Sequence, residues 1–334
     1  MSLRAWAPGR VNLIGDHTDY TAGWALPLAI GLGVEIQGER GGNWVILGSE
    51  GSDGMAEMPL LIDHPNKVEP PWARYVAGVI AELAPTDGLV GTVRSTLPSS
   101  LGLSSSAALE VAAALALGAD QGDSLGIAEL CQRAEHRAVG VPCGIMDQFC
   151  IVSAVEGAAL LIDFRALEAD AIPMPRDVDV VVVDSGQQRA LTASPYRQRH
   201  AECARVERLV GPLRDATLSD IEAIDDPVLQ RRARHVITEN DRVDAMALAL
   251  EDGDLRQAGA LMLASHASLR DDYEVSTRRL DGLVEHLGSS RGVFGARLTG
   301  AGFGGCVVAL CRPHTQLDVP VVWRGHPAAG ATLK

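Results

Sequence analysis

Pro98-Ser99-Ser100-Leu101-Gly102-Leu103-Ser104-Ser105-Ser106-Ala107-Ala108 is a glycine–serine loop that leads directly into an alanine- and leucine-rich stretch at residues 108–118. Alanine and leucine are strong helix formers, and Gly118 ends the stretch, so a helix is predicted there. The first N–H groups of a helix have no partner within it, and the helix dipole adds partial positive charge at that end. The sequence therefore predicts a phosphate site at the start of this helix, where serine hydroxyls add donors or bind Mg²⁺.

The same loop could instead serve only as a helix cap, with Ser104 or Ser105 as the capping residue. Three consecutive serines exceed what one cap needs, which favours phosphate binding. The chain has only two lysines, Lys67 and Lys334, and neither lies in a glycine-rich loop. This excludes a P-loop, which needs Gly-Lys-Ser/Thr, and it also excludes the lysine of a protein-kinase fold.

Upstream of the loop, residues 7–20 form a segment rich in charged and ionisable groups. Four such side chains fall within ten residues: Arg10, Asp16, His17 and Asp19. Carboxylates accept hydrogen bonds from vicinal sugar hydroxyls, and an imidazole donates or accepts them. The alternative is a solvated surface turn with a structural salt bridge. Apolar residues at 11–14 and 24–30 frame the segment, and this favours a polyol-binding turn.

Downstream, residues 140–150 place one carboxylate, Asp147, among apolar neighbours. A buried carboxylate without a partner is costly, so we expect a cation beside it, and Arg10 is the candidate. A neighbouring arginine would keep the carboxylate ionised. The alternative is an aspartate that caps a helix. Glu135 is a second acidic residue of interest, although a solvated helix position is its default interpretation.

Length and charge limit the class of protein further. A chain of 334 residues predicts about two domains with a large core. The net charge of −14 argues against duplex nucleic acid as a partner. No apolar run reaches the roughly 18 residues of a membrane span, and the first residues lack an apolar signal region. The six cysteines form no CxxC pair and predict neither a zinc site nor a disulfide framework. We expect a cytoplasmic protein without nucleic-acid or membrane partners.

The remaining pattern alternates helices and strands. Beyond 108–118, helices are predicted at 124–139, 194–210, 228–251 and 254–287. Strands are predicted at 157–164, 178–183, 293–299 and 305–311, with the last two paired through a glycine loop. The boundary between two lobes is expected at 165–176, where apolar strand gives way to acidic residues and prolines. This divides the chain into 1–165 and 166–334.

These segments resemble the galactokinases, a family within the GHMP kinase superfamily. Residues 9–20 resemble the signature Gly-Arg-Val-Asn-Leu-Ile-Gly-Glu-His-Thr-Asp-Tyr, and residues 102–107 resemble the superfamily phosphate motif Gly-Leu-Ser-Ser-Ser-Ala. Residues 144–148 resemble the catalytic-aspartate motif, and residues 297–306 resemble the third superfamily motif. Weaker similarities lie at 196–199, 235–240 and 265–276. The resemblance is nearly full length and in the same order.

The resemblance implies an α/β (α+β) fold with a two-lobed GHMP kinase architecture. The N-terminal lobe would be ribosomal-protein-S5-domain-2-like and the C-terminal lobe ferredoxin-like α/β, with the active site between them. It implies Arg10 and Asp147 as the catalytic pair. The residues implied to contact the sugar are Asp16, His17, Asp19, Gly144 and Tyr196. Those implied to bind ATP are Pro98, Gly102, Leu103, Ser104, Ser105, Ser106 and Ala107. Ser106 and Glu135 would hold Mg²⁺.

The implied activity is ATP-dependent phosphorylation of the anomeric C1 hydroxyl of galactose, which yields galactose 1-phosphate. The partners are therefore a small sugar and ATP, with Mg²⁺ as the metal. Asp147 would accept or orient the hydroxyl proton, and Arg10 would stabilise the transferring phosphoryl group. The sequence leaves the oligomeric state open, and a monomer is compatible with it.

Four positions depart from the family pattern. Asp16 stands where galactokinases usually have glutamate, and it is one methylene shorter. Ser100-Leu101 replaces glycines in the phosphate loop, and Ala301 replaces a glycine in the third motif. The first departure leaves open a kinase for another sugar, such as arabinose, a fucose-type sugar or an N-acetylhexosamine.

Two further alternatives are less well supported by the residues. A non-catalytic sugar and ATP sensor would tend to lose serine-loop residues, whereas residues 104–108 are intact. A mevalonate-type kinase is disfavoured by residues 16–19, which suit a polyhydroxylated substrate.

Overall fold

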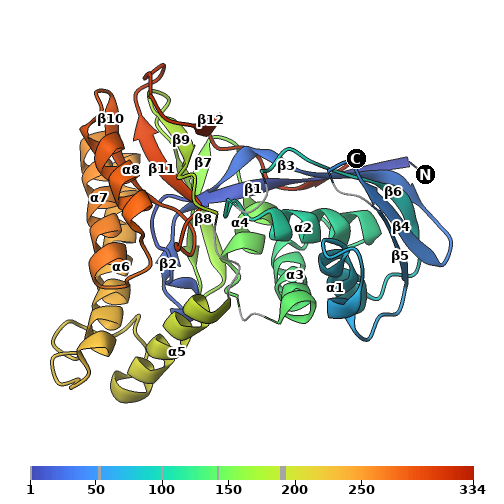
Figure 1. Cartoon of the computed structure of the whole chain (residues 1–334), viewed down its shortest axis with the longest axis horizontal. Coiled ribbons are helices and arrows are strands. Elements are labelled where there is room, and N and C mark those ends of the chain that lie inside the picture. The colour runs from blue at the N-terminus through green and yellow to red at the C-terminus, as the bar shows by residue number, and fades with distance from the viewer. Residues whose placement is uncertain (1, 52–53, 99–100, 141–142, 189–192) are drawn as a thin grey trace.

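The computed structural model describes residues 2–51, 54–98, 101–140, 143–188 and 193–334. Figure 1 shows two lobes that meet along the middle of the molecule, with both chain ends in the same lobe. In that lobe, helices α1 to α4 lie along one side of a sheet. In the other lobe, α6, α7 and α8 lie beside a second sheet. The two-lobed α/β expectation is therefore confirmed.

The first lobe is built on a six-stranded sheet with the order β13-β1-β3-β6-β4-β5. Its strands are β1 (Ser2–Asn12), β3 (Pro27–Arg40), β4 (Trp44–Ser49), β5 (Met55–Pro59), β6 (Leu89–Ser95) and β13 (Thr332–Leu333). Only the β4–β6 pair is parallel among the strand pairs in the described ranges. β1 carries Arg10 and runs from the sheet toward the other lobe, so it positions one end of the site.

The helices that cover this sheet are α1 (Ala73–Leu83), α2 (Ser105–Leu117), α3 (Ser124–Val139) and α4 (Met146–Ser153). The helix predicted at 108–118 is α2, which begins three residues earlier. All of its residues from Ala107 to Leu117 are buried. Small alanine side chains make this possible, because α2 contacts β1, β3, α1 and α3. The phosphate loop is thus attached to one of the most buried helices of the molecule.

A three-stranded sheet lies at the junction of the lobes, with the order β2-β7-β8. Its strands are β2 (Trp24–Ala25), β7 (Ala158–Asp163) and β8 (Glu168–Pro173). The strand predicted at 157–164 is β7. The predicted boundary after residue 165 lies in the turn between β7 and β8, which pair with each other.

The second lobe contains the sheet β10-β11-β9-β12, in which every neighbouring pair is antiparallel. Its strands are β10 (Val293–Leu298), β11 (Cys306–Cys311), β9 (Asp179–Asp184) and β12 (Val321–Gly325). The predicted pairing of the strands at 293–299 and 305–311 is confirmed. Alternate residues of β9 face two cores: Val180 and Val182 pack into the larger one, and Val181 and Val183 into the other.

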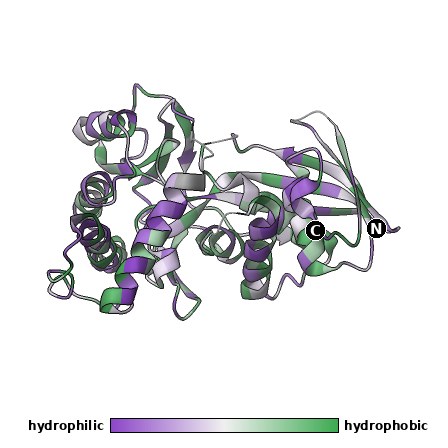
Figure 2. Cartoon of the chain, turned by 60° about the horizontal axis from the view of Figure 1, so that its bottom comes forward, coloured by the Kyte–Doolittle hydropathy of each residue, from purple (hydrophilic) through white to green (hydrophobic). Residues whose placement is uncertain are grey.

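Four helices complete this lobe: α5 (Ala193–Val210), α6 (Pro227–Glu251), α7 (Leu255–Asp271) and α8 (Arg278–Ser289). In Figure 2, the helices of the second lobe carry both hydrophilic and hydrophobic residues, as expected of helices with one buried face. The prediction of a single helix at 254–287 is wrong, because two helices, α7 and α8, occupy that range. Glu274 adopts a left-handed φ of 55° between them, and the Thr277 hydroxyl caps α8 by accepting the Leu280 N–H.

None of the helices in the described ranges is both long and apolar enough to cross a lipid bilayer.

Candidate active site

Arg10, on β1, and Asp147, in the first turn of α4, form an ion pair across 137 residues of sequence. Arg10 Nε donates to Asp147 Oδ1 at 2.7 Å, and Arg10 Nη2 lies 2.6 Å from the same oxygen. The arginine side chain is 4% exposed, whereas that of Asp147 is 29% exposed. Burial alone would lower the pKa of Arg10, but the charges of Asp147 and Asp16 outweigh it and raise that pKa. Arg10 is therefore a buried cation that fixes the position of Asp147, while the carboxylate of Asp147 stays partly exposed.

Ser104 approaches the same carboxylate from the phosphate loop. Its Oγ donates to Asp147 Oδ2 at 2.5 Å, so each carboxylate oxygen has its own donor. Ser104 occupies the N-cap position of α2 with a left-handed φ of 60°, and its side chain makes no capping hydrogen bond. The simple capping interpretation of Ser104 is therefore wrong: its hydroxyl holds Asp147 instead. Sequence reasoning placed this serine at the phosphate and missed its contact with the carboxylate.

The described part of the phosphate loop lies against both lobes. Arg10 Nη1 donates to the carbonyl of Gly102 at 2.9 Å, and the Arg10 backbone N–H donates to the carbonyl of Leu103. From the other lobe, Gly305 comes so close that a Cβ on it would lie 2.9 Å from the Leu101 carbonyl oxygen. Pro98, Ser105 and Ser106 are partly exposed, and Ala107 is buried. Ser99 and Ser100, including half of the Ser100-Leu101 departure, lie outside the described residues.

Glu135, on α3, lies beside the first turn of α2. Its Oε1 accepts a hydrogen bond from Ser106 Oγ at 3.1 Å, and its Oε2 accepts one from Gln148 Nε2 at 2.7 Å. The Cys143 thiol is a third donor, at 3.4 Å. Burial, with the nearby charge of Asp147, raises the pKa of Glu135. The default interpretation of Glu135 as a solvated helix residue is therefore wrong.

Glu110 is a residue of this region that sequence reasoning missed. It follows Ser106 by one helical turn on α2 and is fully buried. Gln148 Nε2 donates to its Oε2 at 3.2 Å, so Gln148 bridges two carboxyl groups. Burial and the charge of Glu135 raise the pKa of Glu110 well above its ordinary value. A lone acidic residue in an alanine-rich helix, four positions after Ser106, was the available signal.

The polar turn is the segment of residues 12–20, which begins at the end of β1. Asp16 is buried in this turn, with 1% of its surface exposed. Its Oδ2 lies 2.7 Å from Arg297 Nη2, and its Oδ1 accepts the backbone N–H of Gly300 at 3.1 Å. Burial raises the pKa of Asp16, although the charge of Arg297 opposes this. The structure thus directs this carboxylate toward the other lobe.

His17 adopts a left-handed φ of 69° and contacts several groups from both lobes. Its Nδ1 lies 2.9 Å from the Tyr20 hydroxyl, and its Nε2 lies 3.3 Å from the Ala301 carbonyl oxygen. The Tyr20 hydroxyl lies 2.6 Å from that of Tyr273, which follows α7. Sequence reasoning did not assign Tyr20 or Tyr273 any part in this arrangement, because only the fold brings them together.

Asp19, Gly144 and Tyr196 lie close to one another beside Asp147. A Cβ on Gly144 would lie 1.6 Å from Asp19 Oδ2, so only glycine leaves room for this carboxylate. Burial and the charges of Asp147 and Asp16 raise the pKa of Asp19 to about 7. Burial and the charge of Asp19 likewise raise the pKa of Tyr196 well above its ordinary value.

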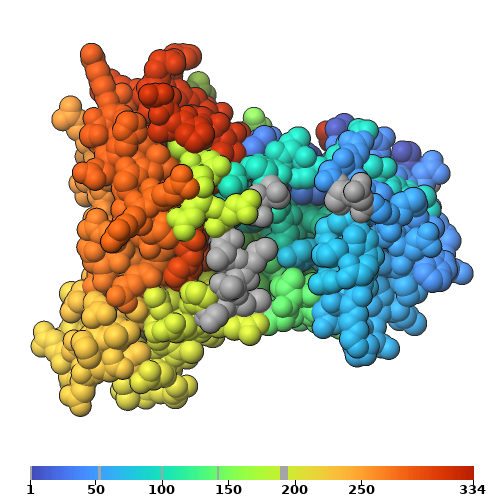
Figure 3. Space-filling model, in the orientation of Figure 1, coloured from blue at the N-terminus to red at the C-terminus, as the bar shows by residue number. Residues whose placement is uncertain are grey.

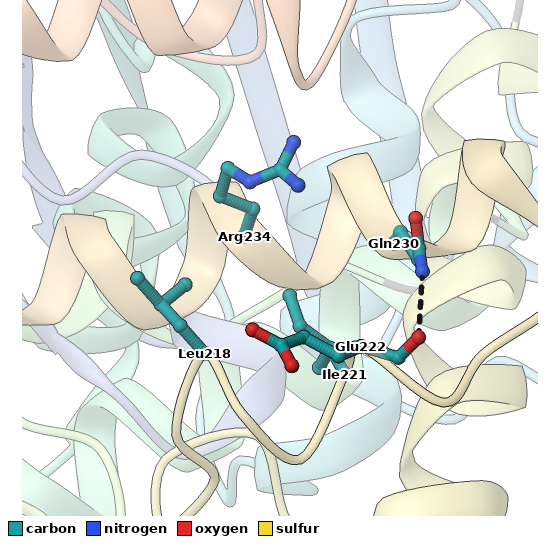
Figure 4. A pocket seen from close by; sticks show the side chains of 5 residues that line it. All are labelled: Leu218, Ile221, Glu222, Gln230 and Arg234. Carbon is teal, nitrogen blue, oxygen red and sulfur yellow. Dashed lines mark hydrogen bonds between the residues drawn. The ribbon is translucent and has the colours of Figure 1, made fainter.

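Figure 3 shows one face of the molecule, on which the green and teal helices of the first lobe lie recessed between the second lobe and α1. A separate hollow of about 370 Å³ lies in the second lobe, beside α6 (Figure 4). Its lining residues are Leu218, Ile221, Glu222, Gln230 and Arg234. None of the predicted site residues is among them.

Three family models match the chain. The GHMP kinases N terminal domain matches residues 74–154, and the GHMP kinases C terminal domain matches residues 246–319. The galactokinase galactose-binding signature matches residues 3–40, which include the polar turn. The matched ranges contain Arg10, Asp147 and the described part of the phosphate loop.

Whole-chain comparisons agree with these matches. The chain is 42% identical to human galactokinase over 350 residues, which covers 95% of this chain and 86% of the human protein. It is 43% identical to galactokinase of Bos taurus, covering 92% of this chain and 83% of the bovine one. The crystal structure of Lactococcus lactis galactokinase complexed with galactose superposes with a TM-score of 0.90, 32% identity and coverage of 99% and 95% of the two chains.

A mevalonate kinase from Methanococcus jannaschii shares the fold alone, at 20% identity and a TM-score of 0.71 over 97% of this chain and 98% of that one. Identity to the human and bovine galactokinases is more than twice as high, over 92–95% of this chain. The protein belongs to the galactokinase family of GHMP kinases.

Proposed function

We propose that this protein transfers the γ-phosphoryl group of ATP to the C1 hydroxyl of galactose, with Asp147 and Arg10 as the catalytic pair. The observation that carries the proposal is the Asp147 carboxylate itself. It is partly exposed, held by Arg10 on one oxygen and by Ser104 on the other, at the start of the phosphate-loop helix. The likeness to galactokinases over 92–95% of the chain supports galactose as the sugar.

The two donors hold the Asp147 carboxylate in a fixed position, from which one of its oxygens can accept a proton. An anomeric hydroxyl is more acidic than an ordinary alcohol, so a carboxylate is a sufficient base for it. As the C1 oxygen attacks the γ-phosphorus, the bond from that phosphorus to the bridging oxygen of ADP breaks, and the hydroxyl proton passes to Asp147. Arg10, buried beside Asp147, stabilises negative charge on the transferring group.

The first turn of α2 supplies the ATP side of the site. Backbone N–H groups at a helix start bind phosphate, and they are reinforced here by the helix dipole. We assign the triphosphate to residues 98–107. Phosphoryl transfer depends mainly on positioning and charge stabilisation, and α2, which is buried from Ala107 to Leu117, fixes the position of its first turn.

The residues present fit a magnesium ion. Ser106 Oγ and Glu135 Oε1 are hard oxygen ligands 3.1 Å apart, and the other partners of Glu135 are the uncharged Gln148 and Cys143. In the described ranges there is no group of three His, Cys, Asp or Glu side chains with metal-site geometry. Ser106 and Glu135 would hold Mg²⁺ together with phosphate oxygens, and the bound ion would neutralise phosphate charge.

We propose that the sugar lies beside Asp147 in contact with His17, Asp19, Gly144 and Tyr196. Asp19 offers a carboxylate for two hydroxyls, and glycine at position 144 keeps space for it. Asp16 was also expected to contact the sugar, but its carboxylate is engaged by Arg297 and Gly300. We place the enzyme in the cytoplasm, with sugar and ATP as its ligands.

A panel of sugars tests this proposal. Purified enzyme is incubated with ATP and Mg²⁺ and, in turn, with galactose, glucose, L-arabinose, D-fucose and N-acetylgalactosamine, and ADP release is measured. We expect galactose to give the highest kcat/KM. A higher value for another sugar would reassign the substrate. No sugar-dependent ADP release, combined with galactose binding by calorimetry, would identify a sensor instead.

A further inference from the structure

The polar turn that carries the sugar-binding residues is fastened to the second lobe. The Asn12 N–H donates to Thr299 Oγ1 at 2.9 Å, and the same hydroxyl donates to the Asn12 carbonyl at 3.1 Å. The Gly15 N–H donates to Glu239 Oε1 at 2.9 Å. The turn therefore makes buried hydrogen bonds to Thr299, which directly follows β10, and to Glu239 on α6.

Asp16 is the charged centre of this contact. Arg297, its partner, is fully buried and also lies 3.8 Å from Glu239. Burial alone would raise the pKa of Glu239, but Arg242, His235 and Arg297 outweigh it and lower that pKa to about 2. A buried arginine between two carboxylates is costly to disturb, because removing one charge leaves another without compensation.

The glycine loop that Asp16 holds, residues 300–305, lies against the phosphate loop, since a Cβ on Gly305 would lie 2.9 Å from the Leu101 carbonyl oxygen. Gly300 has a φ of +80° and donates its N–H to Asp16, while a Cβ on it would lie 3.5 Å from the Gly102 carbonyl oxygen. That carbonyl also accepts the hydrogen bond from Arg10. A displacement of Gly300 would therefore be transmitted to Gly102 and Arg10, on the ATP side of the site.

We propose that Asp16 is a positioning residue that fixes the glycine loop, residues 300–305, against the phosphate loop and does not touch the sugar. Its Oδ1 accepts the Gly300 N–H, its Oδ2 lies 2.7 Å from Arg297 Nη2 as an ion pair without hydrogen-bond alignment, and 1% of its surface is exposed. Aspartate is also one methylene shorter than the glutamate of the galactokinase signature, so it reaches less far from the turn. The proposal rests on the proposed function and assigns Asp16 to the ATP side of the same site.

A deoxy-sugar scan separates positioning from sugar contact. Wild type, Asp16→Asn and the control Asp19→Asn are assayed with galactose and with galactose analogues that each lack one hydroxyl other than that on C1. If a residue binds one hydroxyl of the sugar, a variant without that residue discriminates less between galactose and the analogue that lacks this hydroxyl. The galactose-to-analogue ratio of kcat/KM then falls by about 10-fold or more for a charged partner. We expect this loss in Asp19→Asn for at least one analogue.

In Asp16→Asn we expect every galactose-to-analogue ratio of kcat/KM to stay within about 3-fold of wild type. We also expect kcat to fall and the KM for ATP to rise, by about 10-fold together, because asparagine lacks the negative charge that pairs with Arg297 and strengthens the hydrogen bond from Gly300. Loss of discrimination against one analogue, with the KM for ATP unchanged, would overturn the proposal and make Asp16 a sugar ligand. If Asp16→Asn does not fold, Asp16→Ser, which also removes the charge, undergoes the same scan with the same two criteria.

Arg297→Gln provides the matched partner variant. If Arg297 and Asp16 act as a unit, the double variant will have a higher kcat than the product of the two single effects predicts. Independent effects would contradict the pairing. Failure of the proposed function is recognised separately, since wild-type enzyme would then phosphorylate none of the sugars or would prefer another sugar to galactose.

Discussion

Asp147 depends on two residues from distant parts of the chain for its position. Arg10 comes from β1 and Ser104 from the start of α2, and each binds one carboxylate oxygen. The arginine could be predicted from the sequence, because a carboxylate among apolar residues needs a cation. The serine contact could not, because it requires the left-handed φ of 60° at Ser104, which residue type does not reveal.

Asp147→Asn should lower kcat by at least about 10², the usual contribution of an acid–base group, while galactose still binds. Asparagine keeps the shape of the side chain but cannot take up the proton. Steady-state kinetics and calorimetric titration with galactose measure the two effects. Asp63→Asn, at an exposed position in the first lobe, should leave both unchanged. Near-normal turnover of Asp147→Asn would remove Asp147 from the mechanism.

Asp19→Asn should change the pH dependence of stability. The pKa of Asp19 is raised from 3.8 to about 7 in the folded protein, so the folded state binds its proton more tightly than the unfolded state. Its stabilising contribution is present below about pH 4 and is lost as the pH rises toward 7. The variant should therefore gain thermal stability over wild type at pH 8 relative to pH 5. An equal difference in Tm at both pH values would contradict the raised pKa.

At the scale of elements, helix α1 packs against α3 through a glycine. A Cβ on Gly78 would lie 2.4 Å from the Ala134 carbonyl oxygen. This oxygen belongs to the backbone of α3, so it cannot rotate away as a side chain could. Gly282, on α8, has nothing within 4 Å of the corresponding position. The two glycines therefore serve different purposes although both lie within helices.

Gly78→Ala should lower the free energy of unfolding by about 1–3 kcal/mol, since α1 and α3 must separate to admit the methyl group. Gly282→Ala should raise it by up to about 1 kcal/mol, because alanine is the better helix former in open space. Urea denaturation of both variants checks this. Equal effects of the two substitutions would show that helix propensity, rather than packing, decides at position 78.

Most elements could be predicted from composition and periodicity, including α2, α3, α6 and the paired β10 and β11. The range 254–287 could not be divided correctly, because Asp272-Tyr273-Glu274 carries no proline or glycine to end a helix. Tertiary contacts end it instead: Arg199 donates to the Tyr273 and Glu274 carbonyls, and Arg232 donates to that of Asp272. Such contacts come from α5 and α6 and are invisible in local sequence.

At the scale of the whole molecule, the lobes share their interior. One face of β9 packs into the core of the first lobe, and β13 returns to pair with β1. The division at residue 165 stays a prediction. Length and composition indicated two lobes, but the shared core and the polar contacts between the turn and β10 depend on long-range pairing that a single sequence does not display.

Two buried histidines make the stability of the protein depend on pH in the acidic range. Burial lowers the pKa of His235 and of His266 from 6.5 to about 4, so the unfolded state binds their protons first as pH falls. Each therefore removes stability between about pH 6.5 and 4. Buried carboxyl groups with raised pKa values act in the opposite sense, so variants must be compared with wild type. His235→Gln should lose less stability than wild type between pH 7 and 5, and His64→Gln, at an exposed position, should behave as wild type.

The most direct test of the account is the identity of the product formed from galactose, ATP and Mg²⁺. Proton-coupled ³¹P NMR distinguishes a phosphate on C1 from one on any other carbon, because the phosphorus then couples to the anomeric proton. We predict a single new sugar ester with that coupling, formed by wild type and strongly reduced in Asp147→Asn. A phosphate on another hydroxyl, or ADP with inorganic phosphate and no sugar ester, would contradict the assignment of Asp147 to the C1 hydroxyl.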